Sequence, residues 1–227
     1  MPIFKINGNI VYFCHIPKSG GTTVWHAFLN SGCAVNFFDG QFWHTPQNRW
    51  HKSSPQHILR DDLSILFPKD FFDYDFTIVR DPVDRFLSGF NHNRTKIGRH
   101  VSVDRFLSAL EKRKLGKDDF FGNRFDNHFV PACRFVSNNT QVFYLEDGME
   151  GIISKIRDKI NLHIETPSMK NKKSYKNSAS SDGSLKGFMR GLIFPYSPKR
   201  HDLTELQIDK IKLIYREDYE YFNFRDR

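Results

Sequence analysis

The chain has 227 residues, of which 39% are hydrophobic and 15% aromatic. This length and composition suit a packed globular protein, exclude a disordered chain, and favour a single domain over residues 1–227. The formal net charge of +8 indicates an anionic partner, but charge alone does not choose among nucleic acid, acidic lipid, a polyanionic glycan and a phosphorylated cofactor.

Targeting signals and the number and spacing of cysteines indicate the cellular compartment of the protein. No stretch approaches the roughly 20 apolar residues that span a bilayer, so we expect no transmembrane segment. The start, MPIFKINGNI, lacks the charged and apolar regions of a signal peptide. Three cysteines without a CxxC pair argue against a disulfide framework or a zinc ribbon. We therefore expect a cytoplasmic protein, with peripheral contact to a membrane left open.

Predicted strands and helices alternate along the chain. In order, the pattern predicts a strand at 10–16, a helix at 22–30, a strand at 76–79, a helix at 83–91 that Asp81 caps and Pro82 begins, a helix at 101–115, a strand at 141–145 with a helix after it, and a last helix near 208–222. This alternation predicts an α/β fold, with a P-loop-like central parallel sheet flanked by helices. The polar residues 166–200 are expected to form a long, mobile surface loop.

The segment HIPKSGGTT, residues 15–23, joins the first strand to the first helix. Such a loop presents backbone N–H groups and the positive end of the helix dipole, which together attract an anion. The residues that could contact it are Lys18, Ser19, Gly20, Gly21, Thr22 and Thr23. The chemistry indicates a phosphate or a similar oxyanion, although an ordinary glycine-containing turn has the same pattern.

The loop differs from that of magnesium-dependent nucleotide hydrolases. Lys18 precedes the glycines, so the pattern GxxxxGK[ST] is absent. Arg80 follows the strand at 76–79, at the place where a magnesium-binding aspartate would stand. We therefore expect cations and amides, rather than a metal, to hold the anion.

Two motifs together resemble those of a known family. HIPKSGGTT (15–23) and TIVRDPVDRFLSGF (77–90) are similar to the cofactor motifs of the PAPS-dependent sulfotransferases, in the carbohydrate branch related to heparan and dermatan 2-O-sulfotransferases and their bacterial relatives. Further segments are similar, so the resemblance covers most of the chain: SPQHILRDDL (54–63), DNHFVPACRFV (126–136), VFYLED (142–147) and IYREDYEYF (214–222).

The resemblance implies a sulfotransferase with PAPS as donor, PAP as product and no metal. Lys18 and the loop around it would contact the phosphosulfate, with Lys18 at the leaving oxygen. Arg80 and Ser88 would bind the 3′-phosphate, provided that the helix turns Ser88 back toward the end of the strand. Otherwise Arg80 could be a capping or surface-paired residue.

The acceptor hydroxyl must lose a proton, and histidine, with an ordinary pKa of roughly 6.5, suits that task at neutral pH. His57 matches the family's catalytic histidine by its position ahead of the VRDP segment, so the resemblance implies that it is the base. His44 and His51 are candidates for substrate contact, and His15 for a supporting or core position. Ordinary polar positions are expected for His92, His100, His128, His163 and His201.

Some sulfotransferases use a glutamate base, but residues 1–110 contain no glutamate. Among the acids upstream of the second motif, Asp39, Asp61 and Asp62 are the ones considered as nearby, and the last two could merely begin a helix.

The acceptor implied by the resemblance is a hydroxyl, most often on a saccharide, so a glycan or glycolipid is the expected partner of a bacterial-type soluble enzyme. Several residues could grip an acidic glycan or the cofactor, or could form a solvated face and core: Trp43, Arg94, Lys96, Arg99, Lys170, Lys172, Lys173 and Tyr175. Two alternatives stay open. A nucleotide-dependent kinase would need magnesium, and a non-enzymatic binder of polyanions would lose affinity steeply with salt.

Overall fold

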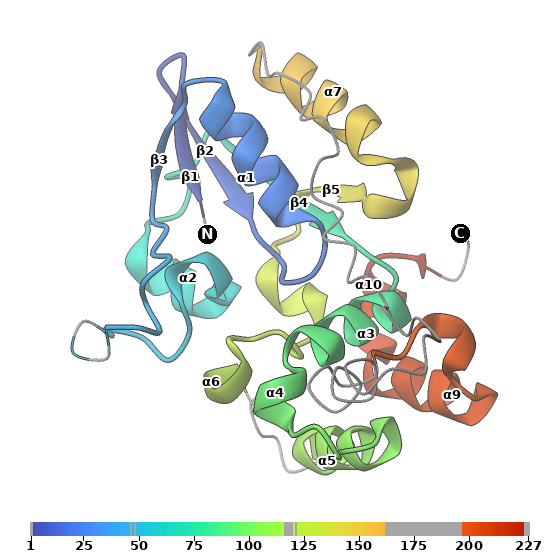
Figure 1. The fold of residues 1–227 in the computed structure, drawn as a ribbon. Coiled ribbons are helices and arrows are strands. Elements are labelled where there is room, and N and C mark those ends of the chain that lie inside the picture. The colour runs from blue at the N-terminus through green and yellow to red at the C-terminus, as the bar shows by residue number, and fades with distance from the viewer. Residues whose placement is uncertain are drawn as a thin grey trace, which may run out of the picture.

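The computed structural model describes residues 2–45, 47, 49–115, 120, 122–161 and 197–224. Its centre is a five-stranded sheet in the order β3-β1-β2-β4-β5 (Figure 1). The strands are β1 (Ile3–Ile6), β2 (Asn9–Cys14), β3 (Ala34–Asn36), β4 (Tyr74–Val79) and β5 (Gln141–Tyr144). The α/β class is confirmed, and the three predicted strands correspond to β2, β4 and β5.

The sheet is mixed, which corrects the expectation of a parallel sheet. β2, β4 and β5 run parallel, whereas β1 pairs antiparallel with both β2 and β3. The reversal after β1 occurs at Asn7 and Gly8, whose φ angles of 49° and 87° suit a tight hairpin turn. The Asn-Gly pair was the local sign of a hairpin and therefore of β1, a strand that hydrophobic periodicity alone did not predict.

Helices cover both faces of the sheet. The α-helices are α1 (Gly21–Asn30), α2 (Arg60–Leu66), α3 (Pro82–His92), α4 (Arg94–Ile97), α5 (Val103–Leu115), α6 (Gly122–Phe125), α7 (Met149–Ile160), α9 (Glu205–Ile214) and α10 (Arg216–Tyr221). Short 3-10 helices are η2 (Pro55–His57), η3 (Ala132–Phe135), η4 (Leu145–Asp147) and η5 (Arg200–Asp202). The predicted last helix is divided at Tyr215 into α9 and α10.

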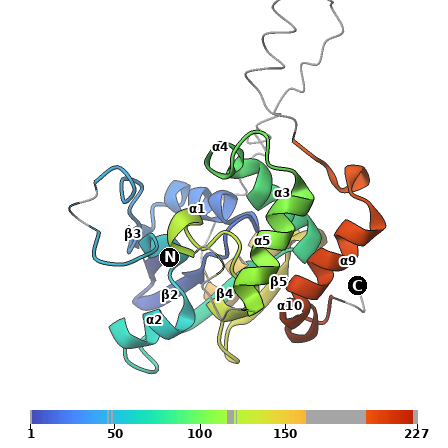
Figure 2. The same cartoon turned by 90° about the horizontal axis from the view of Figure 1, so that it is seen from below.

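Successive side chains of β2 point to opposite faces of the sheet and so belong to two different hydrophobic clusters. Val11 and Phe13 face one cluster, to which α1 and α7 contribute their apolar sides. Tyr12 and Cys14 face the other, which includes buried residues of α3, α5, α9 and α10. Figure 2 shows α3, α5 and α9 gathered on one side of the molecule, where α9 lies next to both α3 and α5.

A buried ion pair fixes the segment that follows α6. Arg85 of α3 lies 3.5 Å from Asp218 of α10 and donates a 2.7 Å hydrogen bond to the carbonyl of Val130. Asp218 accepts the backbone N–H groups of Ala132 and Cys133 at 2.9 Å. Because both charges are paired and buried, removing either one would leave the other uncompensated. The pair therefore holds the segment that carries Asp126 and His128 against α3.

The second predicted helix starts as expected. Asp81 accepts hydrogen bonds from the N–H groups of Val83 and Asp84, and Pro82 occupies the first helical position. Of the expected loop at 166–200, only residues 197–200 fall within the described part. Within the described chain, no helix is long and apolar enough to cross a membrane.

Candidate active site

The two predicted cofactor segments meet at one edge of the sheet. β2 and β4 are parallel neighbours, with Cys14 paired to Thr77, so the chain leaves both strands at the same edge. The loop 15–20 follows β2, and Arg80 follows β4. Burial, and then the positive charge of Arg80, lower the pKa of Lys18, as expected for two cations at one edge of the sheet.

The loop after β2 is tightly packed and has groups that could contact an anion. Gly20 has a φ of 84°, and a Cβ atom at Gly21 would collide with the ring of His15. Ser19 is buried, and its hydroxyl has no hydrogen-bond partner among the described residues. Gly20 also caps the ten-residue α1 without a side-chain acceptor, and the N–H of Thr23 donates to the carbonyl of Gly20 at 3.0 Å, so the N–H groups of Gly21 and Thr22 are the ones that can face a ligand. These residues fit a phosphate-like group.

A histidine–aspartate pair lies at the same site. His57 ends η2, and its Nδ1 donates a 2.7 Å hydrogen bond to Oδ2 of Asp126. The N–H and the hydroxyl of Ser54 each donate a 2.7 Å hydrogen bond to the same carboxylate. Asn127 fixes the backbone by donating to the carbonyl of His57 at 2.8 Å. With Nδ1 protonated toward Asp126, Nε2 of His57 carries the lone pair that can accept a proton.

The charge of Asp126 is secured by its partners. Burial by itself would raise the pKa of this carboxyl, but His57 and the hydrogen bonds from Ser54 outweigh burial and hold the pKa far below its usual range. Asp126 therefore stays ionised at neutral pH and can stabilise a positively charged His57. This is the arrangement in which a carboxylate orients and supports a histidine base.

Two further histidines surround His57. The ring centres of His15 and His128 lie 5.0 and 5.3 Å from that of His57. Burial, together with the positive charge of His57, lowers the pKa of both His15 and His128. The expectation that His128 is an ordinary polar residue is wrong, because only 8% of it is exposed and it belongs to this cluster.

The same cluster could be considered for a metal. One ligand atom each from His57, Asp126 and His128 lie within 4.8 Å of one another. However, Asp126 already accepts three short hydrogen bonds, and a metal on this carboxylate would have to displace some of them. The donor set therefore suits proton transfer better than metal binding.

One family model, described as "Sulfotransferase family", matches residues 5–225. The chain belongs to the sulfotransferase family. No curated protein and no solved structure matches it. The family match covers the loop after β2, the start of α3 and the histidine cluster, which confirms the family predicted from the motifs.

In this sulfotransferase, Ser88 lies on the partly exposed side of α3 with Asp84 and Asn91. Asp84 lies 3.4 Å from the guanidinium of Arg200, and Asn91 donates a 2.9 Å hydrogen bond to the carbonyl of Pro198. Between the residues described, no hydrogen bond joins Ser88 to Arg80. The segment at 198–200 thus crosses α3 beside Ser88, an association that the motifs did not predict.

Other predicted residues of the sulfotransferase have different environments. His44 is exposed, whereas His51 contacts Ser53 at 3.1 Å and Asp62 at 3.2 Å. Asp61 and Asp62 lie in the first turn of α2, the alternative that the sequence left open. Trp43 lies beneath Arg49 and near Lys96, with 4.8 and 5.7 Å to the ring centre. His163, Lys170, Lys172, Lys173 and Tyr175 are outside the described residues.

The residues of the candidate site that sequence reasoning missed are Asp126, Ser54 and His128. Asp126 and His128 open the segment DNHFVPACRFV, which resembled the family's middle, and Ser54 opens SPQHILRDDL. Those resemblances were the available signal, but they assigned no role to these residues. The pairing of His57 with a residue 69 positions later required the fold.

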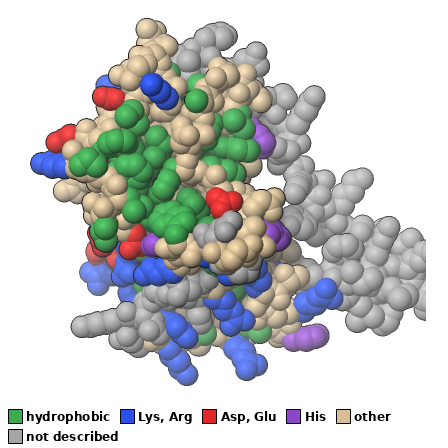
Figure 3. All heavy atoms as spheres, turned by 90° about the vertical axis from the view of Figure 1, so that its left-hand side faces the viewer, with side chains coloured by type: hydrophobic (Ala, Val, Ile, Leu, Met, Phe, Trp, Pro, Cys, Tyr) green, Lys and Arg blue, Asp and Glu red, His purple; other side chains and the backbone are tan. Residues whose placement is uncertain are grey.

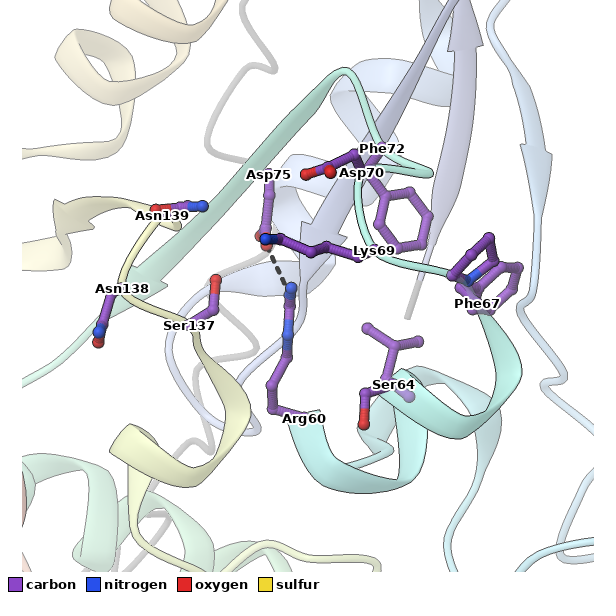
Figure 4. Close-up of a pocket in the computed structure, with 12 residues that line it drawn as sticks. Arg60, Ser64, Phe67, Lys69, Asp70, Phe72, Asp75, Ser137, Asn138 and Asn139 are labelled. Carbon is purple, nitrogen blue, oxygen red and sulfur yellow. Dashed lines mark hydrogen bonds and ion pairs between the residues drawn. The ribbon is translucent and has the colours of Figure 1, made fainter.

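A cavity of about 540 Å³ lies away from this chemistry (Figure 4). Arg60 and Asp75 form a 2.6 Å ion pair in its wall, and Phe67 and Phe72 add aromatic surface. Asp75 lies near the start of β4, whereas the candidate site follows the end of β4. The cavity is therefore not part of the proposed transfer site.

The surface charge of the sulfotransferase is uneven. In Figure 3, lysine and arginine side chains gather along the lower part of the face, and hydrophobic side chains cover much of its upper part. Exposed hydrophobic residues include Ile65 and Leu66 of α2 and Phe71 after it. The basic residues could serve an anionic substrate or form a solvated face, and the geometry is compatible with both.

Proposed function

We propose that this chain transfers the sulfuryl group of PAPS to a hydroxyl on a carbohydrate, with His57 as the base. The observation that carries the proposal is the 2.7 Å hydrogen bond from His57 Nδ1 to Asp126, beside a glycine loop that carries Lys18. A base and an anion-binding loop at one sheet edge are what sulfuryl transfer to an alcohol requires.

The donor would be held by residues of two motifs. Ser19, Gly20, Gly21, Thr22 and Thr23 would surround the 5′-phosphosulfate, and the buried, unpartnered hydroxyl of Ser19 supports this assignment. Lys18 would neutralise negative charge as it develops on the departing phosphate. Arg80 and Ser88 would bind the 3′-phosphate of PAPS and of the product PAP, because an arginine fork suits a terminal phosphate.

The acceptor oxygen would attack sulfur in line with the departing phosphate. His57 would take the hydroxyl proton on Nε2, and the ionised Asp126 would stabilise the imidazolium that forms. A protein supplies such a reaction mainly with positioning and electrostatic stabilisation. A glycan or glycolipid hydroxyl is the acceptor class that we propose.

Calorimetry with PAP, compared with ATP plus magnesium, tests the donor. We expect PAP to bind at least about ten-fold more tightly, and Lys18→Ala or Arg80→Ala to weaken PAP binding because each removes a cation. Equal or tighter binding of ATP with magnesium would contradict the proposal and favour the kinase alternative. Affinity that falls steeply with salt and ignores both substitutions would favour a general polyanion binder.

Transfer itself is tested with labelled PAPS and a panel that includes unsulfated chondroitin and completely desulfated heparin. In the wild-type protein we expect label on at least one glycan. His57→Ala should abolish transfer and leave PAP affinity nearly unchanged, whereas His100→Ala, at an exposed loop position, should behave as wild type. A large loss of PAP affinity in His57→Ala would show that His57 binds the donor instead of acting as base.

A further inference from the structure

His128 has a hydrogen-bonding pattern opposite to that of its neighbour His57. The amide nitrogen of Asn93 donates to the carbonyl of Gly89 at 2.9 Å and lies 2.8 Å from Nδ1 of His128. A carbonyl can only accept, so the Asn93 group that faces it is the NH₂, and its second proton points to Nδ1. Nδ1 of His128 is therefore an acceptor, and in the neutral ring the proton lies on Nε2.

The two imidazoles complement each other. His57 donates through Nδ1 to Asp126, which leaves Nε2 as an acceptor, whereas His128 accepts through Nδ1, which leaves Nε2–H as a donor. A ring nitrogen of His128 lies within 4.8 Å of a ring nitrogen of His57, and the rings meet edge to face. A hydroxyl group can use an acceptor and a donor at once, because its proton donates a hydrogen bond and its oxygen accepts one.

We propose that His128 positions the acceptor hydroxyl by donating its Nε2–H to the hydroxyl oxygen, whose own proton points to Nε2 of His57. This role rests on the proposed sulfuryl transfer. In that reaction the oxygen–sulfur bond forms as the bond from sulfur to the departing phosphate breaks. The hydroxyl proton passes to His57, and His128 keeps its proton throughout.

The surroundings keep His128 neutral, as this role requires. Its side chain is buried, and burial together with the charges of His57, His92 and Lys18 lowers its pKa, against the opposite effect of Asp126. A charged ring would place a proton on Nδ1, facing the NH₂ of Asn93, and would break that hydrogen bond. The charge of His57 favours the neutral ring, and the NH₂ of Asn93 favours the tautomer with the proton on Nε2.

Kinetics of three variants test the role with the glycan that the labelled screen identifies. His128→Leu removes the donor at similar volume, and we expect kcat/KM for the acceptor to fall by about 10- to 100-fold, the effect of losing one buried hydrogen bond. PAP affinity should not change. His128→Gln retains a side-chain N–H and should recover much of the loss, and His100→Leu, at an exposed loop position, should behave as wild type.

Asn93→Asp provides a test that leaves His128 in place. A carboxylate facing Nδ1 would attract the single proton of the neutral ring and leave Nε2 without one, so transfer should fall toward that of His128→Leu at a pH where the ring is neutral. Nitrogen-15 NMR of the histidine rings reads the tautomer directly, with the Nε2–H form expected for His128 in wild type. Wild-type kinetics in His128→Leu, or an Nδ1–H tautomer in the wild-type protein, would overturn the role of His128. Failure of the proposed function would appear differently, as a wild-type protein that neither binds PAP nor labels a glycan.

Discussion

Asp126 determines which nitrogen of His57 can act, because its carboxylate accepts the Nδ1 proton at 2.7 Å. Ser54 in turn holds that carboxylate with two hydrogen bonds. His57 was predicted to be the base from its place in a motif, but the orientation of its ring depends on a partner from a different motif. No spacing rule connects a 3-10 helix before α2 with a turn after α6, so this part of the site could not be derived from the sequence.

Asp126→Asn tests this orientation at nearly constant volume. The new amide can present N–H to Nδ1 of His57, which would move the ring proton to Nε2 and remove the acceptor. We expect kcat for sulfuryl transfer to fall by about 100- to 10,000-fold, the range that general-base catalysis contributes. Calorimetry should show unchanged PAP affinity. A kcat within a few-fold of wild type would mean that His57 does not need Asp126.

The loop between β2 and α1 is the element that the sequence described best. Its glycines, hydroxyls and lysine predicted an anion site, and the structure places them between a strand end and a helix start. The short strands β1 and β3 were not predicted, because β1 depends on the Asn7-Gly8 turn and β3 has only three residues. Pairing with neighbouring strands, rather than local periodicity, stabilises elements this short.

Gly21→Ala tests the close packing inside this loop. The added Cβ would collide with the His15 ring, so the loop or the ring must move. We expect PAP affinity to fall by about 10-fold or more, because the anion site depends on the position of the backbone. Gly151→Ala in α7 is a matched control, since a Cβ there meets nothing within 4 Å. Gly151→Ala should keep PAP affinity and raise the free energy of unfolding by about 0.5 to 1 kcal/mol. Equal PAP affinity in Gly21→Ala and Gly151→Ala would mean that the contact between Gly21 and His15 does not matter for the anion site.

Across the whole molecule, the site depends on contacts between segments distant in the chain. His57 comes from η2, Asp126 and His128 from the turn after α6, and Asn93 from the end of α3. The Arg85–Asp218 pair fastens two of these segments to α10. The family resemblance included the segments around His57 and Asp126 but did not predict that they meet, and the tautomers of two histidines follow only from hydrogen bonds that the folded chain makes.

The buried histidines also make stability depend on pH. Burial and the charge of His57 lower the pKa of His15 and His128 in the folded protein, whereas in the unfolded chain both should titrate near the ordinary value of about 6.5. Below that value the unfolded state binds more protons, so acid favours unfolding. The lowered pKa of Asp126 adds a similar loss only below about pH 4, outside this window.

Urea titrations between about pH 7.5 and about pH 5.5 measure this effect. The free energy of unfolding should fall on acidification, at a rate that approaches about 1.4 kcal/mol per pH unit for each histidine. In His128→Leu only His15 remains, so the slope should be about half that of wild type, whatever the absolute stability of the variant. His201→Leu, at an exposed position, should leave the slope unchanged. A stability that is flat or rises toward acid would mean that His15 and His128 are not held neutral by the fold.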